Sequence, residues 1–252
     1  MKINRRQFVR NLGLGTASLS MGSLISTSSC APSGDSRDKR GKVSDDDQFL
    51  FIGDDIAIAQ TEYGKVQGYL LNHVYTFLGV PYGADTSGKN RFMPPQKPEP
   101  WTDVRPAVFY GNTAPQRMEN RWPNNYGTFA DHWNYWDVSE DCLYLNVWTP
   151  GIADGKKRPV LVWLHGGGFT NGSGIEQDGY HGENISREGD IVFCSINHRL
   201  GPIGFSDLSG VGGEAYKDSG NVGMLDIIAA LRWVHDNIAN FGGDPGNVTV
   251  MG

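Results

Sequence analysis

Apolar and polar residues alternate along residues 56–82, the first stretch of the chain with a regular pattern. Gly64, Gly68 and Asn72 interrupt the alternation at short intervals, as turn residues do. A period of two places one set of side chains on a buried face and the other set in solvent. The pattern therefore predicts an antiparallel meander of short strands near the edge of a sheet.

Three later segments are apolar over the length of a strand: 143–148, 159–164 and 190–196. The segment from Pro159 to Leu164 is almost continuously apolar, which is typical of a central strand that is covered on both faces. We therefore expect these segments to form the interior of a sheet.

Between residues 221 and 241 the apolar period changes to three and four, which indicates a helix. The predicted buried face consists of Met224, Ile228, Leu231, Val234, Ile238 and Phe241. Ser219 or Asn221 can cap the start of the helix, and Gly242-Gly243 with Pro245 ends it.

A last short strand is predicted at 248–250, directly after this helix. Strands that alternate with crossovers and a helix are typical of an α/β fold. We expect a mostly parallel central sheet with helices on both sides and an N-terminal antiparallel meander.

Residues 83–139 lack a regular pattern and are rich in proline and aromatic residues. The aromatic run consists of Trp122, Tyr126, Phe129, Trp133, Tyr135 and Trp136. A loop of this length within a compact domain is usually functional or disordered, and its aromatic content favours an ordered loop. We interpret it as the lining of a gorge or a lid; packing that merely pins the loop down is the alternative.

Residues 1–30 resemble a twin-arginine export signal. Arg5-Arg6 precede Phe8, and a weakly apolar stretch follows over residues 12–25 that is too short and too polar for a stable membrane span. The resemblance implies export to the periplasm or cell surface of a bacterium. A basic helix that arose by chance is the alternative.

Cys30 ends the sequence Thr27-Ser28-Ser29-Cys30, which resembles a lipobox, although Thr27 stands where leucine is usual. A lipid on Cys30 would attach the protein to a membrane, and both lipidation and its absence remain open. Residues 31–52 are largely polar and charged, as expected for a tether. We thus expect an export signal over 1–30, a tether over 31–52 and a globular part over 53–252.

The net charge of −6 is unevenly divided. Residues 1–42 hold eight basic and two acidic residues, whereas the remaining 210 residues hold 14 basic and 26 acidic residues. An acidic body argues against nucleic acid as a partner. The three cysteines, Cys30, Cys142 and Cys194, lack the spacing of a zinc site, and we expect neither a metal nor a cofactor.

The sequence Leu164-His165-Gly166-Gly167-Gly168-Phe169 directly follows a predicted strand. Consecutive glycines leave the backbone bare, so that N–H groups can point at a ligand oxygen and stabilise the negative charge of an attacked ester carbonyl. A phosphate-binding loop is the alternative, but no Gly-Lys-Ser/Thr follows the glycines.

Several ordered motifs resemble the type-B carboxylesterase family, which includes cholinesterases and neuroligins. Besides the glycine turn, the motifs are those at 77–83, 91–95, 140–150, 197–205 and 220–226. The resemblance covers about residues 57–252 and implies the α/β-hydrolase fold, serine-dependent hydrolysis of a small-molecule carboxylic ester, and no cofactor.

By this resemblance, Gly167 and Gly168 supply two N–H donors of an oxyanion hole. Gly252 resembles the first glycine of a G-x-S-x-G nucleophile elbow, and no complete copy of that motif occurs. We therefore expect a domain that is truncated at the elbow, lacks the serine, acid and histidine of the triad, and is inactive alone. A non-catalytic binding module of the same fold is the alternative.

The resemblance also implies two ion pairs that brace the fold, Arg199 with Asp226 and Arg91 with Glu140. Ser173 lies near the glycine turn, but we interpret Gly172-Ser173-Gly174 as a plain loop. By family position, His165 introduces the turn and His198 begins a structural motif, so neither is expected to be catalytic.

Family members often pair the cysteine at the position of Cys142 with an upstream cysteine that closes the aromatic loop. This chain has Ala114 at the matching place, so we expect Cys142 to be free. Cys194, within an apolar strand, is expected to be a small buried apolar residue.

Overall fold

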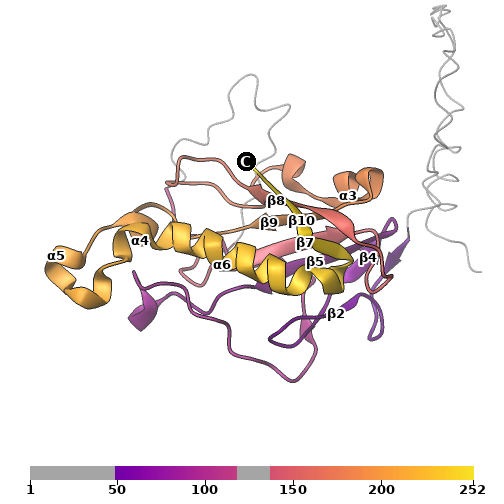
Figure 1. Ribbon diagram of the computed structural model, residues 1–252, viewed down its shortest axis with the longest axis horizontal. Helices are drawn as coiled ribbons and strands as arrows, with labels where there is room; N and C mark the ends of the chain where they lie inside the picture. Colours follow the sequence, from indigo (N-terminus) through magenta and orange to yellow (C-terminus); the bar gives the residue numbers. More distant parts are fainter. Residues whose placement is uncertain (1–48, 118–136) are drawn as a thin grey trace, which may run out of the picture. The chain divides into compact units, whose positions relative to one another are not determined.

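The computed structural model describes residues 49–117 and 137–252 (Figure 1). The expected export signal, the lipobox at Cys30 and the aromatic run from Trp122 to Trp136 lie outside the described residues.

Two β-sheets form the framework of the described part. The larger sheet has the strand order β1-β4-β5-β7-β9-β8-β10. Its strands are β1 (Leu50–Phe51), β4 (Tyr69–Leu71), β5 (Val74–Pro81), β7 (Tyr144–Thr149), β9 (Val192–Ile196), β8 (Arg158–Leu164) and β10 (Gly243–Met251). The smaller sheet consists of β2 (Ile58–Gln60), β3 (Lys65–Gln67) and β6 (Arg105–Pro106).

The predicted meander is divided between the two sheets. β2 and β3 pair antiparallel in the small sheet, whereas β4 and β5 form a hairpin in the large one. The hairpin turns at Asn72 and His73, whose φ angles of 49° and 65° fit a two-residue turn of type I′. The turn at Asn72 is thus confirmed. The second sheet was not predicted, because β6 joins β3 from a distant part of the sequence.

The large sheet is mixed, which corrects the expectation of a mostly parallel one. The pairs β1–β4, β4–β5, β5–β7 and β7–β9 are antiparallel, and only β8–β9 and β8–β10 are parallel. A parallel pair needs a long crossover, and the described α-helices occur in the two connections that follow β8. The antiparallel N-terminal part is confirmed.

Two hydrophobic clusters cover opposite faces of the large sheet. Val162 and Cys194 belong to the cluster that includes residues of α6 (Val222–Asn237), while Trp148 and Phe193 belong to the other. On that second face, the Ser186 hydroxyl of α3 (Glu183–Gly189) donates to the Trp148 carbonyl. Helices therefore lie on both sides, as expected. β9 is buried along its whole length, whereas β8 is buried only at alternate positions, contrary to its continuous apolar pattern.

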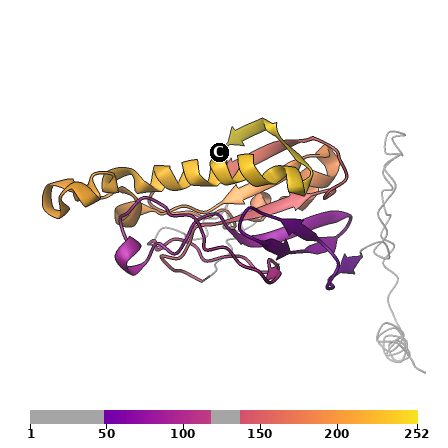
Figure 2. The ribbon, with the colours of Figure 1, turned by 60° about the horizontal axis from the view of Figure 1, so that its bottom comes forward.

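α6 confirms the predicted helix, which ends in a 3-10 turn at Ile238–Phe241 (Figure 2). Its buried face is rotated from the predicted one: Ile227 is 6% exposed and Ile228 is 41% exposed. The buried face includes Asp226 and Ala230, which a hydrophobic pattern does not mark. The predicted face was therefore wrong at its N-terminal half.

The two ends of α6 differ in how well they were predicted. Neither Ser219 nor Asn221 makes a side-chain cap; the Ser219 hydroxyl instead accepts from the Leu208 N–H at 2.8 Å. Gly242 ends the helical segment in the left-handed region with φ of 77°, as predicted. A Cβ on Gly242 would lie 2.2 Å from the Gly151 carbonyl oxygen, so this position requires glycine.

Shorter helices fill the connection between β9 and α6. They are α4 (Gly201–Phe205), α5 (Ser209–Gly212) and the 3-10 turns at Glu214–Tyr216 and Ser219–Asn221. Among the described helices, none has the length and apolar character that crossing a membrane requires.

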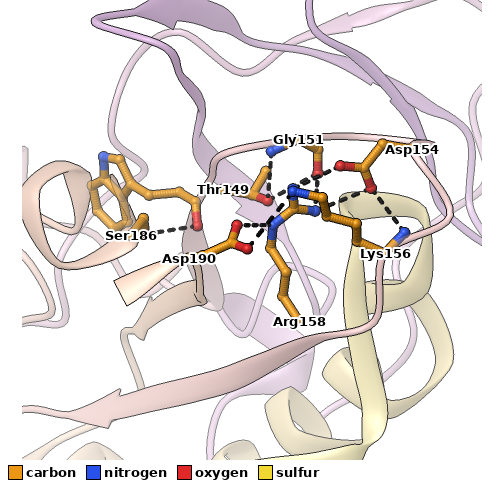
Figure 3. A network of polar contacts seen from close by, with 8 residues as sticks. Thr149, Gly151, Asp154, Lys156, Arg158, Ser186 and Asp190 are labelled. Carbon is orange, nitrogen blue, oxygen red and sulfur yellow. Dashed lines mark hydrogen bonds and ion pairs between the residues drawn. The ribbon is translucent and has the colours of Figure 1, made fainter. Parts of the chain in front are cut away.

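Arg158, the first residue of β8, is a buried arginine that the sequence pattern did not indicate. Its guanidinium donates to both carboxylate oxygens of Asp154, at 2.6 and 3.1 Å, and to Asp190 at 2.7 Å (Figure 3). Its backbone N–H donates to the Gly242 carbonyl. Arg158 thereby joins a loop, the end of α3 and the turn before β10. The hydrogen bonds from Arg158 lower the pKa of Asp154 and of Asp190.

Candidate functional site

The glycine turn follows the carboxyl end of β8, at the edge of the sheet where ligands bind in open α/β folds. Gly167 and Gly168 have φ angles of 111° and 60°, and Phe169, with φ of 63°, extends the left-handed conformation. A Cβ on Gly167 would lie 2.0 Å from the Asn171 carbonyl oxygen. The turn at Gly167 therefore requires glycine for both its φ angle and its close packing.

Both N–H groups predicted as oxyanion donors are available to a ligand. Gly167 and Gly168 are exposed, and no acceptor within residues 49–117 and 137–252 engages their N–H groups. The Gly167 carbonyl accepts from the N–H groups of Thr170 and Asn171, at 3.1 and 3.3 Å. These bonds close the turn through the Gly167 carbonyl and do not use the N–H groups of Gly167 and Gly168.

Two side-chain amides hold the segment that follows the turn. The Gln116 carboxamide accepts from the Gly172 N–H at 2.7 Å and donates to the Gly172 carbonyl at 2.8 Å. The Asn197 carboxamide accepts from the Gly174 N–H at 2.8 Å and donates to the Asn112 carbonyl at 3.0 Å. Neither amide was predicted from the sequence, because neither belongs to a recognised catalytic pattern.

His165 and His198 stack on each other, with ring centroids 4.9 Å apart and an interplanar angle of 12°. The Nδ1 atom of each ring lies within 2.9 Å of a neighbouring carbonyl oxygen, that of Gly166 or Arg199. Because a carbonyl only accepts, both rings carry a proton on Nδ1. Burial lowers the pKa of His198. The stack is consistent with the expected structural role of both residues.

Ser173 is 3% exposed and makes no hydrogen bond to a histidine in the part of the chain that the structure describes. A nucleophilic serine needs a base within hydrogen-bond reach, so the geometry favours the plain-loop interpretation.

Arg199 and Asp226 form a buried ion pair, and both side chains are fully buried. The guanidinium donates to both carboxylate oxygens, at 2.8 and 2.6 Å, and the Arg199 N–H adds a third bond at 3.0 Å. Burial raises the pKa of Asp226, and the bonds from Arg199 oppose that shift. Arg199 also donates to the Met93 carbonyl, so the pair joins α6 to the proline-rich segment after β5.

Arg91 and Glu140 also form their predicted ion pair, at 2.7 Å. Their side chains are 47% and 19% exposed, so this pair lies at the surface rather than in the core. Solvent screens such a pair, and it braces the fold less than the buried pair does.

Cys142 and Cys194 are both free and buried, as expected. Burial raises the pKa of each thiol, which keeps the reactive thiolate form rare. Ala114, which stands at the matching place for a cysteine partner, is also buried. The described ranges contain no group of three or more His, Cys, Asp or Glu residues that could hold a metal.

Two pockets lie away from the glycine turn. One, of about 320 Å³, lies beside α6, between Trp233 and residues 94–97. A second one, of about 280 Å³, is lined by Gly174, Tyr110 and His181.

The sequence is similar to characterised esterases over most of the described part. It is 43% identical to the para-nitrobenzyl esterase of Bacillus subtilis and 45% identical to the phenmedipham hydrolase of Pseudarthrobacter oxydans. Each alignment covers 77% of this chain and 37% of the relative. The chain therefore spans little more than a third of the length of these relatives.

Solved esterase structures match the fold. An esterase from Clostridium hathewayi, described as able to hydrolyse aliphatic aromatic polyesters, has a TM-score of 0.73 at 42% identity. That match covers 81% of this chain and 39% of the other. The carboxylesterase of Geobacillus stearothermophilus has a TM-score of 0.67 at 42% identity and covers 77% and 37% of the two chains.

The α/β fold agrees with these similarities. The family model described as the carboxylesterase family matches residues 55–252, which is more than half of the sequence. The chain belongs to the carboxylesterase family.

Proposed function

We propose that the gene product hydrolyses small-molecule carboxylic esters through an acyl-enzyme, and that this chain supplies two oxyanion donors. The observation that carries the proposal is the pair of N–H groups at Gly167 and Gly168, which no acceptor among the described residues engages and which lie on a turn that packing fixes. Donors that are oriented before the reaction stabilise the charge that develops on the attacked carbonyl oxygen.

The end of β10 supports the same proposal. A Cβ on Gly252 would lie 2.6 Å from the Leu164 carbonyl oxygen, so β10 ends directly beside the start of the glycine turn. A nucleophile elbow that begins at Gly252 would bring its serine next to the oxyanion donors. We propose that the serine, acid and histidine lie outside these 252 residues, which alone would be inactive.

In the proposed reaction the serine oxygen attacks the ester carbonyl carbon while a histidine takes the serine proton. The negative charge on the carbonyl oxygen is held by the N–H groups of Gly167 and Gly168. The alcohol leaves with the proton from the histidine, and water then attacks the acyl-enzyme and releases the acid.

We propose that the protein acts outside the bacterial cytoplasm. Export is supported by the paired arginines, by the weakly apolar stretch after them and by the net positive charge of residues 1–42. Cys30 is the candidate for a lipid anchor. Fractionation of cells that express the native gene product tests the anchor: Cys30→Ser should release the protein from the membrane fraction. Unchanged membrane attachment would argue against it.

The first experiment is to measure the intact mass of the native gene product and its hydrolysis of p-nitrophenyl acetate. We expect a mass well above 27.6 kDa and measurable hydrolysis. Gly167→Ala should lower kcat by about 100-fold, because its Cβ would collide with the Asn171 carbonyl and displace the donors.

Gly155→Ala is the matched control, because Gly155 also has a positive φ, of 71°, and its Cβ would meet no atom within 4 Å. This variant places an alanine at a positive φ, as Gly167→Ala does, but far from the turn in sequence. Its kcat should therefore be unchanged. Binding of the ester without hydrolysis by the intact product would instead favour the non-catalytic binding module.

A further inference from the structure

We propose that Gln116 is a positioning residue for the oxyanion donors, which acts on Gly167 and Gly168 through Gly172. The inference rests on the proposed esterase function. The Gln116 carboxamide makes two hydrogen bonds to the backbone of Gly172, which is buried. The Gln116 side chain, from a loop distant in sequence, thus holds both the N–H and the carbonyl of Gly172, which follows the turn.

Gly172 lies in close contact with the start of the turn. A Cβ on Gly172 would lie 2.3 Å from the Gly166 carbonyl oxygen and 2.4 Å from Nδ1 of His165. A displacement of Gly172 would therefore push on the two residues that precede the oxyanion donors. Asn171, the residue before Gly172, packs against Gly167, because its carbonyl oxygen lies 2.0 Å from the position that a Cβ on Gly167 would take.

The segment that carries Gln116 is itself fixed. Ala114 is buried, and its carbonyl accepts a hydrogen bond from the Gln116 carboxamide at 3.1 Å. The Thr113 N–H donates to the Asp137 carbonyl at 2.9 Å, and the Thr113 carbonyl accepts from the Ser139 N–H at 3.0 Å. The carboxamide therefore acts from a rigid base and can hold Gly172 in one place.

Only a carboxamide fits this role, because Gly172 presents a donor and an acceptor side by side. Methionine has a similar shape but would leave the buried N–H and carbonyl of Gly172 without partners, which is unfavourable. Glutamate would keep the acceptor and place a second oxygen against the Gly172 carbonyl. Protonation of that glutamate would restore a donor.

The test uses the intact gene product and the variants Gln116→Met and Gln116→Glu. We expect Gln116→Met to lower kcat about 10- to 100-fold with KM changed less than about threefold, because misplaced donors act on the transition state. Affinity for a trifluoromethyl ketone, whose serine adduct places an oxyanion in the hole, should fall in proportion to kcat. Affinity for the corresponding methyl ketone, a weakly reactive analogue of the same shape, should hold.

Gln116→Glu provides a signature that a merely structural role would not give. Its kcat relative to that of the native protein should rise as the pH falls toward the pKa of the introduced carboxyl, about 4.3 for an isolated glutamate. Gln96→Met and Gln96→Glu are the matched controls, because the exposed Gln96 also donates to a carbonyl, that of Pro94, at 3.0 Å. Both should hydrolyse the ester as the native protein does.

Amide hydrogen exchange of the peptide over residues 165–173 gives a readout that does not need activity. Gln116→Met should exchange faster there than the native protein and the Gln96 variants. Faster exchange in a protein that hydrolyses no ester would support the positioning role and overturn the esterase proposal. Native hydrolysis with unchanged trifluoromethyl ketone affinity and exchange in Gln116→Met would overturn the positioning role.

Discussion

Asp226 and Glu140 show, at the scale of single residues, how burial changes what an ion pair contributes. Each carboxylate lies within 2.7 Å of an arginine nitrogen. Asp226 and Arg199 are fully buried, whereas Arg91 and Glu140 are partly exposed. Removing one partner of a buried pair leaves an uncompensated charge, while water replaces the lost partner of an exposed pair.

Asp226→Asn should therefore lower the free energy of unfolding by about 3–5 kcal/mol, because the Arg199 guanidinium stays buried without its counter-charge. Urea denaturation of the intact gene product measures the loss. Glu140→Gln is the control and should cost clearly less. Equal losses in the two variants would mean that the buried pair contributes no more than the surface pair.

At the scale of elements, the orientation of α6 is the clearest difference between the sequence pattern and the structure. The helix was predicted because apolar residues recur at three and four positions. Its buried face was missed because Asp226 and Ala230 count as polar or neutral in such a pattern, although a buried arginine compensates the Asp226 charge. The Arg158 network was missed for a related reason, since one of its two carboxylates, that of Asp190, lies 32 residues away in sequence.

Ile227 and Ile228 provide a direct test of the helix orientation. Ile227→Ala should lower the free energy of unfolding by about 2–5 kcal/mol, because its side chain is 6% exposed and leaves a cavity. Ile228→Ala, at a position that is 41% exposed, should stay within about 0.5 kcal/mol of the native protein. Thermal and urea unfolding measure both; the reverse order would support the face that the sequence predicted.

The ion pairs of Arg158 should make the stability of the protein depend on pH. They join the loop before β8, the end of α3 and the turn before β10. It lowers the pKa of Asp154 and Asp190, so these carboxylates bind protons more weakly in the folded than in the unfolded protein. Their contribution is complete above the unfolded value, about 3.9, and is lost as the pH falls through the lower folded values. The double variant Asp154→Asn, Asp190→Asn should lose less stability than the native protein between pH 5 and pH 2, as measured by urea unfolding. An unchanged slope would contradict this role.

At the scale of the whole molecule, the sequence motifs and the structure agree on the family. The glycine turn was predicted because three consecutive glycines follow a strand. The positive φ angles of Gly167 and Gly168 show why glycine is needed there. The amides that hold it, Gln116 and Asn197, could not be predicted, because their hydrogen bonds join segments that lie 23 to 85 residues apart in sequence. Fold class thus follows from local pattern, whereas the support of the site depends on long-range pairing.

β10 is the last strand of the large sheet in the described part, and its outer edge has no partner strand there. Val250 and Met251 are each 46% exposed, although both are apolar. An open apolar edge strand is a template for pairing with another chain. We therefore expect a polypeptide of these 252 residues to aggregate on expression.

Val250→Lys tests whether β10 causes the aggregation, because a charge on an exposed edge strand opposes pairing between chains. The variant polypeptide of 252 residues should yield more soluble protein than the unmodified one in a sedimentation assay. Val211→Lys is the control: Val211 is 88% exposed but lies in α5, away from the edge, so it should give no gain. A soluble, monomeric, unmodified polypeptide with a cooperative thermal transition would contradict the prediction and would mean that β10 is stable at an open edge.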